Sequence, residues 1–284
     1  MIVSLNFVYN MSTRKPKQIA PCPMKFYNGD WSPDDLQFPL IALNKIDGIF
    51  VWKWRGKALS KDNKLITNDS IRIGVERNFP DGINGEIFIT GGNFQDVASF
   101  VATKTAVDSN ARIALFDIAV PHTPYSTRLS HACKIQANII PDKIIIPSYR
   151  ICENYNDVEK FYNFFLSNVS NFEGLVLRSC AGHYKFGRAT LSEATAFKLC
   201  AMKTDEVTWH GTVPSSNVGL NQAGAIIAMH PTYGRMTIGS GFDQELAVKM
   251  HHFPQDYRGK KFRMKYKNSG IKDMPRQPVF DGFV

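Results

Sequence analysis

The sequence has few cysteines and no long apolar run, and each absence excludes a class of protein. Its five cysteines form no Cys-x-x-Cys pair, and their odd number argues against the disulfide framework of a secreted domain. No apolar run approaches the length that spans a bilayer, and the first residues lack a basic leader followed by a sustained apolar segment. The sequence therefore predicts a soluble, intracellular protein with reduced cysteines and no membrane anchor.

Internal repeats and low-complexity tracts are also absent, which leaves an ordinary globular chain. Of its 284 residues, 44% are hydrophobic and 12% are aromatic, enough to build a core in one large domain or in two. The formal net charge of +9 favours a polyanionic partner, with an anionic membrane surface as the other candidate.

Strand-like periodicity dominates the chain and predicts an α+β fold. Clusters of β-branched and aromatic residues, such as GEIFIT and ARIALFDIAV, alternate with Gly, Asn and Asp. Helical periodicity fills residues 94–109 and 156–170. From residue 206 onward we expect only short strands and turns, which indicates a separate small barrel. The predicted divisions are a flexible basic arm at 1–23, a main domain at 24–205 and a small domain at 206–284.

Lys45 follows an apolar run in PLIALNKIDGIFVWKW, residues 39–54, and the chain becomes apolar again after Asp47-Gly48. Burying an unpaired ammonium group is costly, but the turn-forming pair Asp47-Gly48 follows at once. The strand therefore delivers the amine to the edge of a cleft. Taken alone, such a lysine is more often a strand-end side chain that reaches water, because Lys-x-Asp-Gly is a short motif.

Four positions downstream of Lys45 favour the functional interpretation of this lysine over the solvent-exposed one. Each has an ordinary interpretation on its own: a solvated acid at a strand start, a core aromatic ring or a surface lysine. Their occurrence in one order after Lys45 is much harder to dismiss. These positions are Glu86 in NGEIF, Phe116 in LFDI, Glu173 in EGLVLR and Lys198 in FKLC.

This series resembles motifs I, III, IIIa, IV and V of the covalent nucleotidyltransferases, the superfamily of ATP-dependent DNA ligases, RNA ligases and mRNA capping enzymes. Two longer segments, EGLVLRSCAGHYKFGRATLSEATAFKL and KYKNSGIKDMPRQPVF, look like the small bacteriophage and bacterial ATP-dependent DNA ligases. The similarity covers residues 39–282. It implies a nucleotidyltransferase (adenylation) domain of antiparallel sheets with flanking helices, followed by a small all-β OB-fold domain.

The resemblance also implies an activity. Such an enzyme works as a monomer and uses ATP with Mg²⁺ or Mn²⁺ to seal 5′-phosphate/3′-hydroxyl nicks in duplex DNA, in repair, replication or recombination. The reaction passes through a covalent lysyl-AMP intermediate and then adenylated DNA. If phage-encoded, the protein would act in the cytoplasm of a host cell.

Residue roles follow from the same resemblance. Lys45 is the nucleophile that accepts AMP, and we expect burial, the metal and Lys198 to lower the pKa of its amine from about 10.4. Glu173 is expected to bind the metal, Lys198 the α-phosphate and Glu86 the ribose. Phe116 would stack on adenine, and Asp47 would shape the nucleotide-binding turn. Lys61 takes the place of a family arginine that contacts the nucleotide or the nick phosphate.

Basic residues crowd the last third of the small domain, where a DNA backbone would be held, although a solvated basic face has the same composition. The predicted DNA-binding residues are Lys260, Lys261, Arg263, Lys265, Lys267 and Lys272.

Three positions depart from the family pattern. Phe50 stands where motif I carries an arginine, Cys200 where motif V carries a second lysine, and Val284 where related chains end in arginine. The cations that could replace the missing charges are Arg55 or Lys53 for the first and Lys203 for the second. The departures leave two alternatives open: a degenerate ligase fold that binds nicked or duplex DNA without sealing it, and an RNA ligase or capping-type nucleotidyltransferase.

Overall fold

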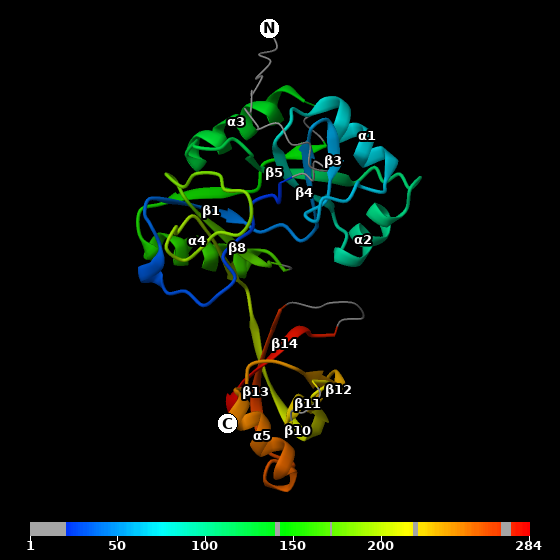
Figure 1. The fold of residues 1–284 in the computed structure, drawn as a ribbon, viewed down its shortest axis with the longest axis vertical. Coiled ribbons are helices and arrows are strands. Elements are labelled where there is room, and N and C mark those ends of the chain that lie inside the picture. Colours follow the sequence, from blue (N-terminus) through cyan, green and yellow to red (C-terminus); the bar gives the residue numbers. More distant parts are fainter. Residues whose placement is uncertain (1–20, 140–142, 171, 218–220, 268–273) are drawn as a thin grey trace, which may run out of the picture.

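The computed structural model describes residues 21–139, 143–170, 172–217, 221–267 and 274–284, which form a larger and a smaller lobe (Figure 1). Helices and mostly antiparallel strands are both present, so the predicted α+β class is confirmed. No helix of the described residues is long and apolar enough to cross a membrane. The predicted arm lies outside the described residues except for its last three, of which Cys22 accepts a hydrogen bond from the Gly187 amide (2.8 Å).

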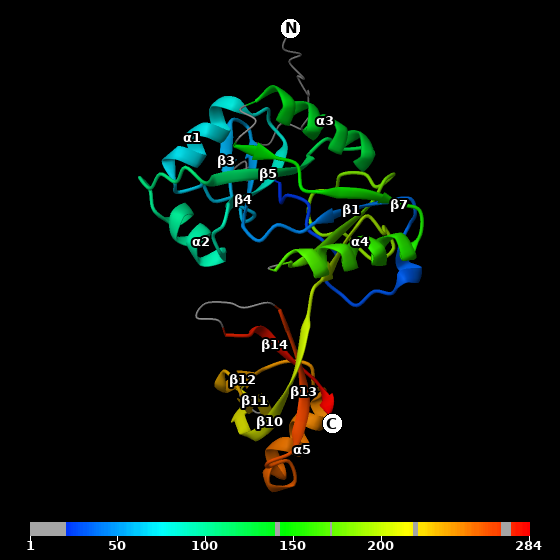
Figure 2. The same cartoon turned by 180° about the vertical axis from the view of Figure 1, so that it is seen from behind.

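The first sheet of the larger lobe is buried on both faces at its central strands. Its elements are β1 (Leu40–Asn44), β7 (Tyr149–Cys152), β8 (Gly174–Ser179) and β9 (Ala196–Cys200), with the helices α3 (Tyr125–Asn138) and α4 (Tyr155–Asn168). The strand order is β7-β1-β8-β9, and all pairs are antiparallel. Leu40 and Ala42 of β1 face a core that includes α4, seen beside the sheet in Figure 2, whereas Ile41 and Leu43 face a core that includes α3. Burial of both faces explains the unbroken apolar run before Lys45.

The second sheet of the larger lobe is covered on one face by two further helices, with part of α3 in the same core. Its elements are β2 (Ile49–Trp54), β3 (Lys57–Leu59), β4 (Ile83–Ile89), β5 (Ala111–Ile118) and β6 (Ile144–Ile145), in the order β3-β2-β4-β5-β6, with α1 (Asp69–Asn78) and α2 (Phe94–Ala102). Val51 and Ile87 share one core with Val75 of α1 and Val97 of α2. The opposite face of the sheet turns Phe50, Glu86 and Phe116 toward a cavity.

Asn68 joins α1 to the end of α2. Its side-chain oxygen accepts a hydrogen bond from the Ile71 amide (3.0 Å), which caps α1. Its amide group donates to three carbonyl groups, those of Phe100, Thr103 and Ala106. The helix α2 ends at Ala102, short of the predicted end at residue 109, because Thr103 has an extended backbone conformation.

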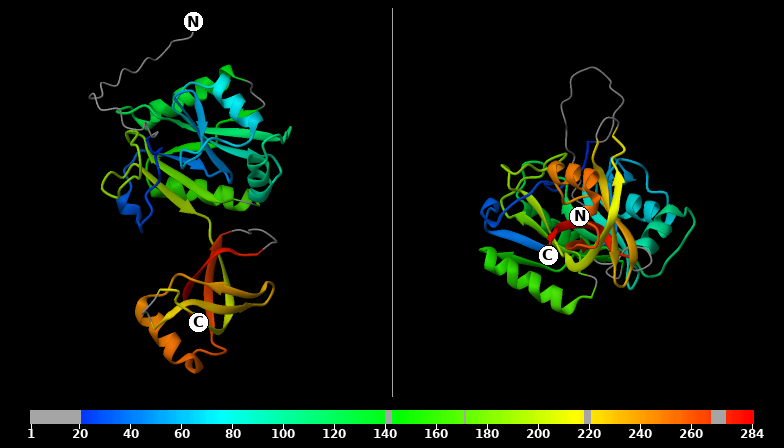
Figure 3. Two further views of the ribbon diagram at one scale, coloured as in Figure 1. Left: turned by 45° about the vertical axis from the view of Figure 1, so that its right-hand side comes forward. Right: turned by 90° about the horizontal axis from the view of Figure 1, so that it is seen from below.

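The smaller lobe is one five-stranded sheet with a helix. Its elements are β10 (Lys203–Pro214), β11 (Ala223–His230), β12 (Gly234–Ile238), α5 (Gln244–His252), β13 (Lys261–Lys267) and β14 (Arg276–Phe283), and the strand order is β12-β11-β10-β13-β14. The chain enters this lobe between β9 and β10 (Figure 3). The prediction of strands and turns alone is wrong at α5, which Asp243 caps by accepting a hydrogen bond from the Leu246 amide (2.7 Å). The described residues also include two short 3-10 helices, at Pro33–Asp35 and Pro254–Asp256.

Candidate active site

A cavity of about 490 Å³ has walls from both sheets of the larger lobe. This volume is in the range of small-molecule and cofactor sites. The predicted site residues that line it are Lys45, Lys61, Glu86, Phe116 and Lys198. Lys203, at the start of β10, is not part of this lining, and neither are Asp47 and Glu173.

The backbone places Lys45 beside Glu173. The Lys45 amide donates a hydrogen bond to the Gly174 carbonyl (3.0 Å), and the Lys45 amine donates one to the Glu173 carboxylate. Gly174 has φ of +125°, and a Cβ added there would lie 2.0 Å from the Leu199 carbonyl oxygen. Only glycine fits this position, so the residue next to Glu173 fixes where β8 begins against β9.

The pKa of Lys45 is raised, although the sequence predicts the reverse. Burial is the largest influence and lowers this pKa, but the carboxylates of Glu173, Glu86 and Asp47 together outweigh it. The amine is therefore protonated in the protein without ligands. The pKa of Lys198, by contrast, is lowered, first by burial and then by the nearby positive charge of Lys45.

Arg276 reaches this site from the smaller lobe. Its Nη1 donates to Glu173 Oε1 (3.3 Å) and to Asp47 Oδ2 (3.3 Å), and its guanidinium lies 4.8 Å from the ring centre of Phe94. Burial raises the pKa of Glu173, but Lys45 and Arg276 outweigh this and leave it lowered. Arg276 is not among the site residues predicted from the sequence. The available signal was its place in PRQPVF, within the segment that resembles the ligases.

Glu173 and Asp47 suit a hard divalent cation. Their carboxylate oxygens converge on one nitrogen of Arg276, at 3.3 Å each, and carboxylate oxygen is the donor that Mg²⁺ prefers in proteins. The described residues contain no group of three or more His, Cys, Asp or Glu side chains placed to hold a metal. An ion held here would take its remaining ligands from phosphate oxygens and water, as Mg²⁺ commonly does.

The opposite wall of the cavity is aromatic. The rings of Phe50 and Phe116 have centres 6.2 Å apart and planes tilted by 47°, and both line the cavity. Glu86 is the cross-strand neighbour of Phe50. Phe50 thus places an apolar ring where the family pattern has an arginine.

Burial raises the pKa of Glu86 to about 7, well above its usual value of 4.5. An acid whose pKa is higher in the folded state stabilises the fold when protonated, and this stability is lost as the pH rises through about 7. We therefore expect Glu86→Gln to raise the free energy of unfolding relative to wild type by about 2 kcal/mol at pH 8 and by much less at pH 5. Urea unfolding at both pH values measures the difference. A gain that is equal at the two pH values would contradict this assignment.

The cations that could replace the missing arginine lie in different places. Lys53 is 9% exposed and donates to the carbonyl oxygens of Glu76 (2.8 Å) and Phe79 (2.6 Å), so it is not the replacement. Arg55 lies in the turn after β2 and does not line the cavity. Lys61 and Arg188 both do. Arg188, in the segment HYKFGR, is a candidate that sequence reasoning missed.

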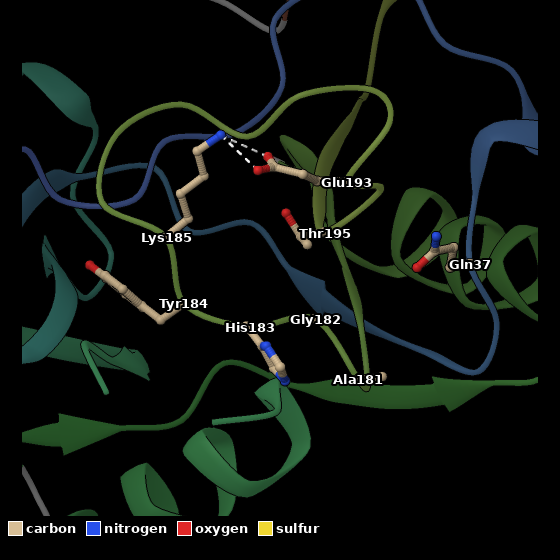
Figure 4. Close-up of a pocket in the computed structure, with 8 residues that line it drawn as sticks. All are labelled: Gln37, Ala181, Gly182, His183, Tyr184, Lys185, Glu193 and Thr195. Atoms are coloured by element: carbon tan, nitrogen blue, oxygen red, sulfur yellow. Dashed lines mark hydrogen bonds and ion pairs between the residues drawn. The ribbon is translucent and has the colours of Figure 1, made fainter. Parts of the chain in front are cut away.

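A second pocket of about 480 Å³ lies along the loop between β8 and β9 (Figure 4). Its lining includes Lys185, whose amine donates to both carboxylate oxygens of Glu193 (2.8 and 2.9 Å). None of the predicted site residues that the structure describes lines this pocket. It therefore gives a place for control substitutions.

The predicted DNA-binding residues lie on or beside β13, where strand alternation separates two faces. Phe262, Met264 and Tyr266 are buried, whereas Lys261, Arg263 and Lys265 are exposed. The exposed cations pair with acids: Lys261 with Glu206 (2.6 Å), and Lys265 (2.6 Å) and Arg263 (3.5 Å) with Asp281. Lys260 lies 5.4 Å from the ring centre of Tyr257, Lys267 is the last residue of β13, and Lys272 is outside the described residues.

Solved structures of DNA ligases are similar to this chain. Chlorella virus DNA ligase, solved as its adenylate, is 30% identical, with 94% of this chain and 99% of that chain covered and a TM-score of 0.58. A Lig E DNA ligase is 20% identical, with 87% and 93% covered and a TM-score of 0.71. The ATP-dependent DNA ligase of bacteriophage T7, in complex with ATP, is 14% identical, with 94% and 99% covered and a TM-score of 0.54.

No protein-family model matches the sequence, and no curated protein does. The last two structures support the fold alone, whereas the Chlorella virus enzyme supports the family across nearly the whole chain. The expected architecture, a nucleotidyltransferase domain followed by an OB-fold domain, is confirmed. With Lys45 in the lining of a nucleotide-sized cavity, its partner Glu173 beside it and this similarity over 94% of its length, the chain belongs to the ATP-dependent DNA ligases.

Proposed function

We propose that the protein is a monomeric, ATP-dependent DNA ligase that seals 5′-phosphate/3′-hydroxyl nicks in duplex DNA and carries AMP on Lys45. The observation that supports this most directly is the ion pair between Lys45 and Glu173, beside a cavity that Phe116 and Lys198 line. We assign residues 24–205 to the nucleotidyltransferase domain and residues 206–284 to the OB-fold domain.

The proposed reaction has three steps. The Lys45 nitrogen bonds to the α-phosphorus of ATP, and pyrophosphate leaves. The 5′-phosphate of the nick then attacks the AMP phosphorus and releases the lysine. Finally the 3′-hydroxyl attacks the phosphorus of the 5′-phosphate, and AMP leaves. In phosphoryl transfer of this kind a protein mainly positions groups and neutralises charge.

The residues in and beside the cavity suit these tasks. Glu173 holds the amine of Lys45 in place, Phe116 offers a flat face to adenine, and Lys198 supplies positive charge to the α-phosphate. A divalent cation at Glu173 and Asp47 would add positive charge at the phosphate oxygens. The Lys45 amine loses its proton more readily when the Glu173 carboxylate, which raises its pKa, binds another cation instead. Arg276 is one such cation, because it already pairs with Glu173.

A ligase-fold protein that binds nicked or duplex DNA without sealing it is the second candidate. Phe50 favours it, because this ring lines the cavity where the family pattern has a charge for a phosphate. Incubation with labelled ATP or GTP followed by denaturing electrophoresis separates the candidates. A covalent AMP band supports the ligase, a GMP band supports a capping-type enzyme, and no band supports the inert binder. Comparing sealing of nicked DNA with sealing of nicked RNA then defines the strand preference.

The exposed face of β13 is the proposed binding surface for the DNA backbone. Replacing Lys261, Arg263 and Lys265 together by glutamine should weaken binding to nicked duplex DNA and flatten its salt dependence. Each phosphate that the variant no longer neutralises reduces the slope of log K against log salt concentration by about 0.9. Fluorescence anisotropy over a range of salt concentrations measures the slope. Lys249→Gln is the matched control, because Lys249 is an exposed cation of α5 that pairs with Glu245 (2.6 Å). If the triple variant keeps the wild-type slope, β13 does not touch DNA.

A further inference from the structure

A buried ion network with unequal charges lies next to the nucleotide cavity. Asp117 of β5 and Arg128 of α3 are each 1% exposed, and Arg178 of β8 is 3% exposed. Both guanidinium groups pair with the one carboxylate of Asp117, Arg128 through Nε at 2.7 Å and Arg178 through Nη2. An arginine stays protonated in proteins, so the network carries one excess positive charge. Such a charge is costly to bury unless an anion or acceptor completes it.

Arg128 is satisfied by the protein itself. Besides Asp117, its guanidinium donates to the carbonyl oxygens of Thr123 and Gly182, the latter at 2.9 Å. Gly182 belongs to the loop after β8 that Figure 4 shows. These bonds connect α3 to β5 and to that loop, so Arg128 has a structural role in joining the two sheets.

Arg178 is held less completely and borders the cavity. Val176 and Arg178 lie two residues apart on β8, so their side chains point to the same face of the sheet, and both line the cavity. Apart from Asp117, Arg178 contacts the sulfur of Met24 (3.6 Å), a weak acceptor, and its guanidinium lies over two aromatic rings, 4.5 Å from the centre of Tyr125 and 5.8 Å from that of Phe26. The Tyr125 hydroxyl donates to the Phe116 carbonyl (2.8 Å), so one tyrosine connects Arg178 to the aromatic wall.

The neighbouring side chains do not supply the missing negative charge. Burial raises the pKa of Tyr125 and of Tyr184 far above neutral pH, so both hydroxyls stay uncharged. Among the described residues, Asp117 is the one acid that forms an ion pair with Arg178. The excess charge therefore borders the space that a ligand would fill.

We propose that Arg178 is a nucleotide-binding residue, held by Asp117 and Tyr125, and that its guanidinium donates to an acceptor atom of the nucleotide in the cavity. This inference rests on the proposed function, because it takes the nucleotide of that reaction as the ligand. Asp117 is then a positioning residue, since it acts through Arg178. The acceptor is either a phosphate oxygen or an acceptor on the adenosine part.

The test uses the full chain and α,β-methylene-ATP, whose α–β bridge is carbon and does not break during transfer. Calorimetry should show that Arg178→Gln weakens binding about 10- to 100-fold, the usual effect of losing one hydrogen bond to a charged group. Arg178→Lys, which keeps the charge but not the planar fork, should weaken it about 3- to 10-fold. Arg112→Gln removes an arginine of β5 that bonds to the Ser109 carbonyl (2.6 Å) and does not line the cavity, so it should bind like wild type.

Adenosine as a second probe distinguishes the two acceptors. If Arg178→Gln weakens adenosine as much as the ATP analogue, the contact is on the base or sugar; if it weakens only the analogue, the contact is a phosphate. The melting temperature of each variant, with and without the analogue, shows whether the variant is folded when its affinity is measured. Wild-type affinity in a folded Arg178→Gln or Arg178→Lys variant would overturn the inference while leaving the proposed function intact. A wild-type protein that binds no analogue would overturn both.

Discussion

Lys45→Ala is expected to abolish the covalent AMP adduct, a loss of at least about 1000-fold against wild type, because no other group at this position can form the phosphoramide bond. The fold should persist. The Lys45 side chain is partly exposed, and Glu173 keeps Arg276 as a partner when the amine is removed. The measurement is adduct formation with labelled ATP at several enzyme concentrations, together with the melting temperature.

Lys45→Arg separates the loss of the nucleophile from the loss of charge. Arginine keeps a positive charge beside Glu173, but its guanidinium does not deprotonate near neutral pH. We expect no adduct from this variant either, with a melting temperature closer to wild type than that of Lys45→Ala. An adduct at the wild-type level in either variant would mean that the nucleophile is another residue and would remove the central element of the proposed function.

The strands were predictable because their signal is local. The unbroken apolar run of β1 and the alternation in β4 and β5 follow from burial of one or both faces of a strand. Three helices were not among the predicted segments: α3, and also α1 and α5, whose buried faces are small. Val75 is the one buried residue of α1, and Ala247 and Met250 are the two of α5, so neither sequence shows a strong apolar stripe.

The candidate site also has features that local sequence encodes and features that it does not. The five motif positions carry a recognisable order, but the order does not say which side chains meet. Arg276 lies 103 positions after Glu173, on the other lobe, and no periodicity encodes that contact. The burial of Lys53 was within reach of the sequence, since Lys53 and Phe50 fall on opposite faces of an alternating strand. The raised pKa of Lys45 was not, because it depends on how closely three carboxylates approach.

Glu173→Gln is expected to slow adduct formation by about 100-fold or more at saturating ATP and Mg²⁺. A neutral amide holds neither the ammonium of Lys45 nor the guanidinium of Arg276 as a carboxylate does, and it is a poor ligand for a hard cation. Raising the Mg²⁺ concentration should therefore not restore the rate. Single-turnover assays with labelled ATP measure this directly.

The pH dependence of the residual reaction distinguishes a role beside Lys45 from a merely structural one. Glu173 is the strongest of the groups that raise the pKa of Lys45, so its neutralisation should lower that pKa and shift the rate profile of the variant toward lower pH. Glu193→Gln is the matched control, because Glu193 pairs with Lys185 outside the nucleotide cavity and its loss should leave both rate and profile unchanged. Full rescue of Glu173→Gln by excess Mg²⁺ would reduce Glu173 to a replaceable metal ligand. A slow variant with the wild-type pH profile would mean that Glu173 does not set the protonation of Lys45, and the ion pair between them would then serve only to place the amine.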